Sequence, residues 1–138
     1  MKIQFALCAQ TVTVDRSSNR LSLINVIDLL PVSNFPHFIP SVAFVCLIES
    51  EDGDRNVKGF VQISSNDVLV GAAEVPIHFT ENRLARVVMN LQGIPVPKPG
   101  PLKFCMTLPN GTVAETSFQV ISVAPKEAIQ VVPPTLES

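Results

Sequence analysis

The sequence is poor in the residues on which most catalytic and recognition sites depend. It contains no tryptophan, no tyrosine, only two histidines and six glycines among 138 residues. Antibody-like recognition uses Tyr and Trp anchors, so this composition disfavours it. Serine-nucleophile motifs and phosphate-binding glycine loops are also missing from the sequence. We therefore expect no enzyme, no catalytic residues and no cofactor.

Strong charge and long apolar runs are scarce as well. Ten basic and twelve acidic residues give a net charge of −2, and the basic residues form no stripe, which disfavours nucleic acid as a partner. No apolar run approaches the ~18 residues of a membrane-spanning helix. Gln4 interrupts the apolar N-terminal stretch, so we expect a first strand there and no secretory signal. These features predict a soluble cytoplasmic protein without a membrane partner.

The chain has three cysteines, Cys8, Cys46 and Cys105, each within an apolar segment and at wide, irregular spacing. An odd number of cysteines without CxxC pairs is typical of buried, reduced thiols in the cytoplasm. A disulfide from Cys46 to Cys8 or to Cys105 across a sandwich is geometrically conceivable, but the compartment rule disfavours it.

Apolar residues make up 46% of the chain, and they occur in short runs between turn residues. Asn110-Gly111 separates two such runs and predicts a β-hairpin with a type I′ turn, because Asn and Gly adopt positive φ at least cost. Gly71 is expected to mark a bulge, and Pro76 an edge strand. The strand-like runs are Ile3–Val14, Leu21–Asp28, Val42–Glu49, Val57–Ser65, Val68–Phe79, Leu84–Leu91, Leu102–Leu108 and Thr112–Phe118.

These runs recur at intervals of about 8–14 residues with no competing helical stripe. They predict an all-β fold, an antiparallel β-sandwich of about seven to nine strands that is immunoglobulin-like or C2-like. Three prolines between residues 29 and 40 exclude a regular helix there and favour an ordered apolar crossover between the sheets. We expect the sandwich to span residues 1–123, followed by a short, flexible C-terminal tail from 124 to 138.

The order of these pieces resembles a family of small bacterial proteins of unknown function that are β-sandwiches. Its members begin with a similar Cys-containing strand and a second strand rich in leucine and isoleucine. The resemblance spans roughly Phe5 to Val123, departs at Leu102, where an aromatic residue is often found, and implies no catalytic residues. It is carried by Phe5–Val12, Leu21–Asp28, Phe35-Pro36, Pro40 and Pro99–Phe104.

Few residues are candidates for chemistry. His37 and His78 are the only histidines, and two hypothetical sites use them: a Cys–His pair, and a metal site with Asp28 and Glu74. Neither set has the spacing of ligands in a known motif. The acidic turn at residues 51–54 lacks the calcium-loop pattern and is expected to be a solvated hairpin tip. We therefore expect no metal site.

Two classes of function remain. In the first, the protein is a non-catalytic protein-binding or assembly module that uses a strand edge, the crossover or the tail to bind a protein partner or to self-associate. In the second, it is a small-ligand-binding sandwich or a weak enzyme, with His37, His78 and the acidic turn as its candidates. Polar groups converging in one pocket would favour the second class, and an exposed apolar patch would favour the first. The expected partner-binding residues are Phe35, His37, Phe38, Ile129, Val131 and Val132.

Overall fold

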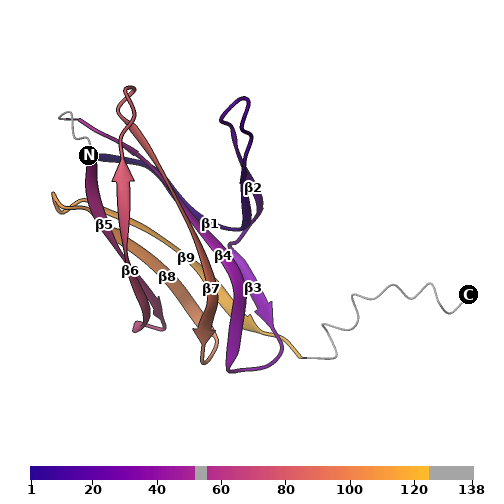
Figure 1. Ribbon diagram of the computed structural model, residues 1–138. Coiled ribbons are helices and arrows are strands. Elements are labelled where there is room, and N and C mark those ends of the chain that lie inside the picture. Colours follow the sequence, from indigo (N-terminus) through magenta and orange to yellow (C-terminus); the bar gives the residue numbers. More distant parts are fainter. Residues whose placement is uncertain (52–55, 125–138) are drawn as a thin grey trace, which may run out of the picture.

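The computed structural model describes residues 1–51 and 56–124, which form nine β-strands and contain no helix (Figure 1). One sheet has the strand order β2-β1-β4-β7, and the other has the order β3-β9-β8-β5-β6. The strands are β1 (Lys2–Val14), β2 (Leu21–Val26), β3 (Leu29–Val32), β4 (His37–Glu49), β5 (Asn56–Ser65), β6 (Val68–His78), β7 (Leu84–Val96), β8 (Gly100–Thr107) and β9 (Val113–Ser122). Within the described residues, no helix has the length and apolarity needed to cross a membrane.

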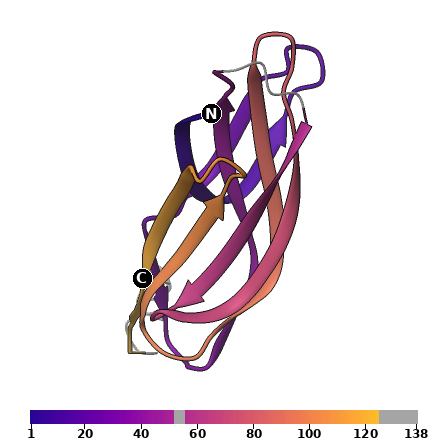
Figure 2. The same cartoon turned by 90° about the vertical axis from the view of Figure 1, so that its left-hand side faces the viewer.

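The two sheets pack face to face, and Figure 2 shows the second sheet in front of the first. Strands β1, β4 and β7 correspond to A, B and E of an immunoglobulin sandwich, and β9, β8, β5 and β6 correspond to G, F, C and C′. Strand β3 extends the second sheet by pairing in parallel with β9. The predicted antiparallel sandwich is thus confirmed, with immunoglobulin-like connectivity and one parallel strand pair.

The core lies between the sheets and is built by the alternation of side chains along each strand. In β8, Leu102, Phe104 and Met106 point inward and are fully buried. The Phe104 ring lies between Phe44 of β4 and Phe118 of β9, with centroid distances of 6.0 and 6.1 Å. These contacts join the two sheets at their centre.

From Val42 to Cys46, strand β4 is buried on both faces. Val42 and Phe44 face the core, while Ala43 and Val45 on the outer face are also at most 1% exposed. The tip of the β1–β2 hairpin reaches β7 on the far side of β4, where the guanidinium of Arg86 donates to the backbone oxygen of Asn19 at 3.1 Å. The continuous apolar run of β4 is therefore that of a central strand.

The predicted hairpin between β8 and β9 is confirmed, but its predicted type I′ turn is wrong. Only Gly111 has positive φ (89°), and its N–H donates to the Leu108 carbonyl at 2.9 Å. Pro109 favours the first central position of a type I turn, which puts Asn110 in second place and leaves Gly111 as the left-handed residue that follows. A type I′ geometry occurs instead at Asn66-Asp67, with φ of 50° and 65°, between β5 and β6.

Other local predictions hold with one addition. The β5–β6 ladder shifts register so that Val70 is extra beside Gly71, and Pro76 lies on β6, which is an edge strand. The crossover between residues 29 and 40 does link the sheets, but its first part forms the short strand β3. Pro31 is tolerated in β3 because that strand is at a sheet edge.

Candidate functional site

The crossover places the three aromatic candidates in different environments. The Phe35-Pro36 peptide bond is cis, and the Phe35 side chain is half-buried against the core. Part of that side chain is thus packed against the sandwich, and its expected role in partner binding stays a prediction. His37 is half-buried, whereas Phe38 on the next position of β4 is 62% exposed. The strand alternation thus leaves only Phe38 fully available at the surface.

The first half of β4 pairs on one side only. Strand β1 pairs with β4 from Lys2↔Glu49 to Ala9↔Ala43, and beyond Ala9 it pairs with β2 instead. Residues 37–42 of β4 therefore pair with β7 but with no other described strand. An unpaired strand edge is a template for pairing with another chain.

A groove lies along this half-paired part of β4, between it, the base of the β1–β2 hairpin and β3. We call it the crossover groove; it encloses a pocket of about 300 Å³. Val26 and Leu29 on its rim are 54% and 51% exposed, and the Asn25 amide donates to Gln10 at 2.6 Å beside them. The groove is lined by Gln10, Asn25, Val26, Ile27, Leu29, Leu30, His37, Ile39, Pro40 and Ser41.

Pro40 limits what the edge of β4 can offer. Proline has no N–H, so one backbone donor is missing from this stretch. Pro40 and Ser41 are both exposed between the buried Ile39 and Val42, which interrupts the regular alternation of the strand. A segment bound here gains less from main-chain pairing and more from side chains placed in the pocket.

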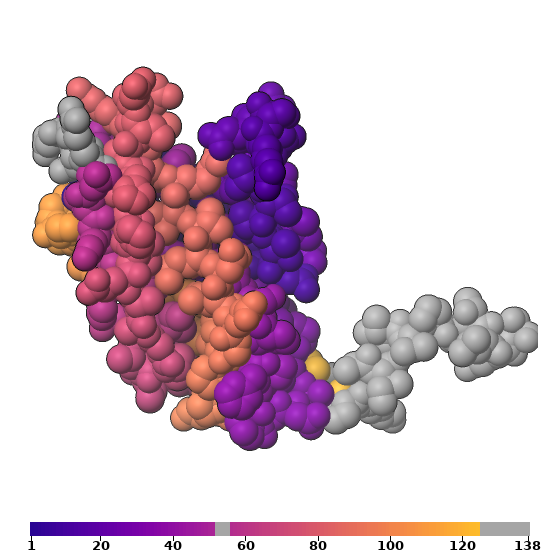
Figure 3. Space-filling view, in the orientation of Figure 1, coloured from indigo at the N-terminus to yellow at the C-terminus, as the bar shows by residue number. Residues whose placement is uncertain are grey.

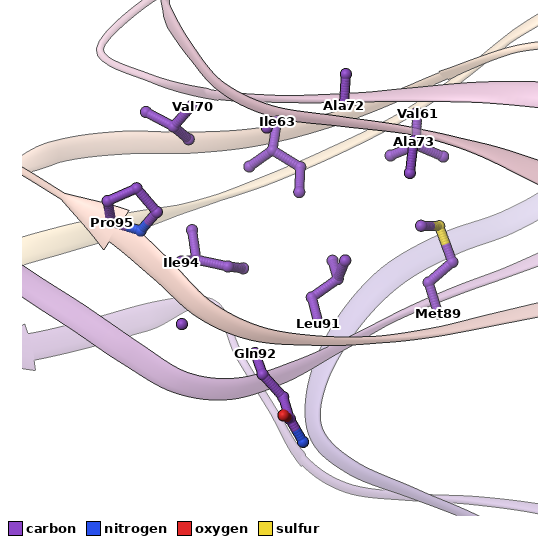
Figure 4. A pocket seen from close by; sticks show the side chains of 12 residues that line it. Val61, Ile63, Val70, Ala72, Ala73, Met89, Leu91, Gln92, Ile94 and Pro95 are labelled. Atoms are coloured by element: carbon purple, nitrogen blue, oxygen red, sulfur yellow. The ribbon is translucent and has the colours of Figure 1, made fainter.

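A second hollow of about 180 Å³ opens between the edge strands β6 and β7 (Figure 4). Gly71, Ala72 and Ala73 make its β6 side shallow, and Figure 4 shows Ile63, Val70, Leu91 and Met89 around it. The Gln92 side chain points away from these apolar groups. We call this the edge pocket; its chemistry is that of apolar contact.

The other candidates for chemistry lie apart from the groove. His78 Nδ1 is 2.7 Å from Asn56 Oδ1, and Glu74 forms a surface ion pair with Lys58 at 4.0 Å. In the part of the chain that the structure describes, no three His, Cys, Asp or Glu side chains come close enough to hold a metal ion. Most of the acidic turn, including Asp52 and Asp54, lies outside the described residues.

All three cysteines are free thiols, and two of them are buried as predicted. Burial raises the pKa of Cys8 and of Cys46 to about 12, since a thiolate would lose its hydration in the core. Cys105 differs: it alternates with Phe104 and Met106 on β8, faces outward and is only half-buried. The prediction of full burial is therefore wrong for Cys105.

Sequence reasoning missed the contribution of the β1–β2 hairpin to the groove. The sequence predicts a regular strand through Asn25 and Val26, and both lie in β2, but Asn25 has φ of 56°. Asparagine adopts this left-handed conformation more readily than most residues, and the imperfect alternation of Leu21–Asp28 was the available signal. The predicted tail residues Ile129, Val131 and Val132 lie outside the described residues.

Comparison with known proteins identifies a family without assigning an activity. No curated protein matches the chain. A family model described as "Family of unknown function (DUF6941)" matches residues 4–121, which include all of β2 to β8 and most of β1 and β9. The expected resemblance to an uncharacterised family is confirmed, and the chain belongs to this family of unknown function, DUF6941.

Proposed function

We propose that the protein is a non-catalytic protein-binding or assembly module that takes up an extended segment of a protein chain in the crossover groove. The observation that carries this proposal is the exposure of Val26 and Leu29 on the rim of a pocket beside the half-paired strand β4. Recognition by strand addition needs two elements, an open strand edge for main-chain hydrogen bonds and apolar side chains beside it that contact the bound segment.

The size and chemistry of the groove suit an extended peptide. About 300 Å³ is at the lower end of ligand pockets, so it matches one or two side chains better than a large cofactor. An extended peptide presents alternate side chains to the pocket. Its main-chain amides can meet the polar groups of Asn25, Gln10 and Ser41, which line the same groove. This arrangement uses the polar groups for orientation and the apolar floor for affinity.

The sequence-predicted residues enter this proposal in different ways. His37 lines the groove, and Phe38 extends the apolar surface beyond it. Ile129, Val131 and Val132 supply a segment of suitable chemistry in the chain itself. We place the activity in the cytoplasm, because three free thiols fit a reducing compartment.

The test is selection of binding peptides from a random library against the whole chain, followed by affinity measurement with rim variants. Val26→Asp and Leu29→Asp place a charge at the pocket, and each should weaken binding at least tenfold. Ile24→Asp is the matched control, since Ile24 lies on the edge strand β2 with Val26, is 47% exposed and does not line the groove. Peptides that bind all three variants equally well would contradict the proposal.

The alternative is a small-ligand-binding sandwich, and the edge pocket is the observation in its favour. An apolar hollow between two sheets accepts a slender apolar ligand. Replacing Gly71 by valine fills this hollow from the β6 side, because a Cβ there lies 3.6 Å from Ile63. If the protein binds an apolar fluorescent probe and Gly71→Val abolishes that binding while Val26→Asp does not, the alternative is supported.

A further inference from the structure

The described chain ends beside the crossover groove. Strand β9 runs parallel to β3, and the Val123 N–H donates to the Val32 carbonyl at 3.0 Å, one residue before the described chain ends at Ala124. Leu29 and Leu30 of the same strand β3 line the groove. In Figures 1 and 3 the last yellow residues emerge beside the purple segment that holds β3 and the start of β4.

The sequence continues for 14 residues beyond this point, from 125 to 138. At about 3.3 Å per residue the fully extended segment reaches roughly 46 Å, and the five residues from Ala124 to Ile129 reach about 17 Å. The four residues of β3 span only about 13 Å by the same measure. The apolar stretch Ile129-Gln130-Val131-Val132 can therefore reach the groove of its own chain.

We propose that residues 129–132 occupy the crossover groove of the same chain, with Ile129 and Val131 in its pocket. In an extended segment these two side chains point to one side and Gln130 to the other. The polar Gln130 then meets solvent or the polar rim, and the two apolar side chains meet Leu29, Leu30 and their neighbours. This inference rests on the proposed function, because it names the resident occupant of the same groove.

Tethering gives this occupant an advantage over any free segment. A short flexible linker gives the tethered segment an effective concentration of about 1 mM at the groove. If the free peptide binds with a Kd of roughly 0.1 mM, the tethered segment lowers the apparent affinity of a free peptide of the same sequence about tenfold. A partner must displace the chain's own C-terminal segment before it binds.

The experiment measures binding of a fluorescently labelled synthetic peptide of residues 125–138 to the full chain. In the variant Ile129→Asp/Val131→Asp the tethered segment no longer fits the pocket, so the labelled peptide should bind about tenfold more tightly than to the unaltered chain. Thr135→Asp/Ser138→Asp adds the same charge outside the apolar stretch and should behave like the unaltered chain. Leu29→Asp, added to the first variant, should remove peptide binding, and Ile24→Asp should not.

Sedimentation of the unaltered chain from micromolar to millimolar concentration completes the test and should give a monomer throughout. A mass that doubles with concentration overturns the proposal in favour of exchange between two copies. Equal peptide affinity for all tail variants also overturns it, while peptide binding that still depends on Leu29 leaves the proposed function intact. If the labelled peptide binds to none of the chains, the tail proposal is overturned. The proposed function is not, because the library selection tests the groove with other segments.

Discussion

Gly100, the first residue of β8, has a conformation and a neighbour that together require glycine. Its φ is +139°, and a Cβ built on it would overlap the Asn66 side-chain oxygen. The Asn66 amide lies there because it donates to the carbonyls of Pro99, at 3.1 Å, and Lys98, at 3.4 Å. Gly100→Ala must therefore both strain the backbone and displace the side chain that fastens the β7–β8 connection to the β5–β6 turn.

The cost of Gly100→Ala follows from these two effects. A non-glycine residue in a disfavoured region costs about 1–3 kcal/mol, and the lost hydrogen bonds cost about 1 kcal/mol more. We expect a loss of about 3 kcal/mol in the free energy of unfolding. With an m-value of about 1.5 kcal/mol/M, the urea midpoint should fall by about 2 M, as measured by far-UV circular dichroism.

Two companion variants separate strain from steric overlap. Gly93 also has positive φ (66°), but a Cβ there meets nothing within 4 Å, so Gly93→Ala should cost only about 1–2 kcal/mol. Asn66→Gly removes the overlapping side chain at a position with φ of 50° that glycine adopts freely. When Asn66→Gly is combined with Gly100→Ala, the free energy of unfolding should be about 1 kcal/mol or more higher than the sum of the two single losses predicts. Additive losses, or a Gly100→Ala cost no larger than that of Gly93→Ala, would refute this reasoning.

Four further predictions concern the hairpin, the core and, in two cases, the thiols. Gly111→Val should lower the free energy of unfolding by about 1–2 kcal/mol, because valine resists the φ of 89° although no neighbour obstructs it; an unchanged urea midpoint would exclude positive φ at this turn. Phe104→Ala should cost about 3–5 kcal/mol by leaving a cavity between two stacked rings, also seen in the urea midpoint. A thiol reagent should label Cys105 before Cys8 or Cys46 in the native protein, and labelling of all three at one rate without denaturant would contradict the burial of the last two. The raised pKa values of Cys8 and Cys46 mean that the native state holds their protons more tightly than the unfolded state, whose thiols titrate near 9. The stabilisation from these two thiols should therefore be complete below about pH 9 and should fall between pH 9 and 12. Urea denaturation across that pH range measures this loss.

Much of the fold could be predicted from the sequence because β-structure leaves local signals. Apolar runs between turn residues mark most of the strands, and the run of Val42–Glu49 indicates a strand buried on both faces. Pro76 indicates an edge strand because it lacks the N–H that a central strand would use, and Gly71 indicates a nearby bulge because glycine weakens a regular strand. Even the hairpin at Asn110-Gly111 is set locally, although Pro109 changes its turn type.

The crossover groove could not be predicted in the same way, because long-range pairing creates it. Whether β4 keeps a partner beside residues 37–42 depends on where β1 leaves it, and β1 does so after Ala9, the residue at which its pairing with β2 begins. The left-handed conformation of Asn25 then places Val26 at the rim beside Leu29. No local pattern encodes the distance between these segments.

By itself the sequence determined the strands, the all-β class and the small number of residues of catalytic type, since these depend on residue type and on neighbours in the chain. Only the tertiary structure decided which strand edges stay open, which cysteine faces outward and that the described chain ends beside the groove. The physical reason is that side-chain alternation is a local property of a strand, whereas the partner of each strand edge is chosen by packing among segments distant in sequence.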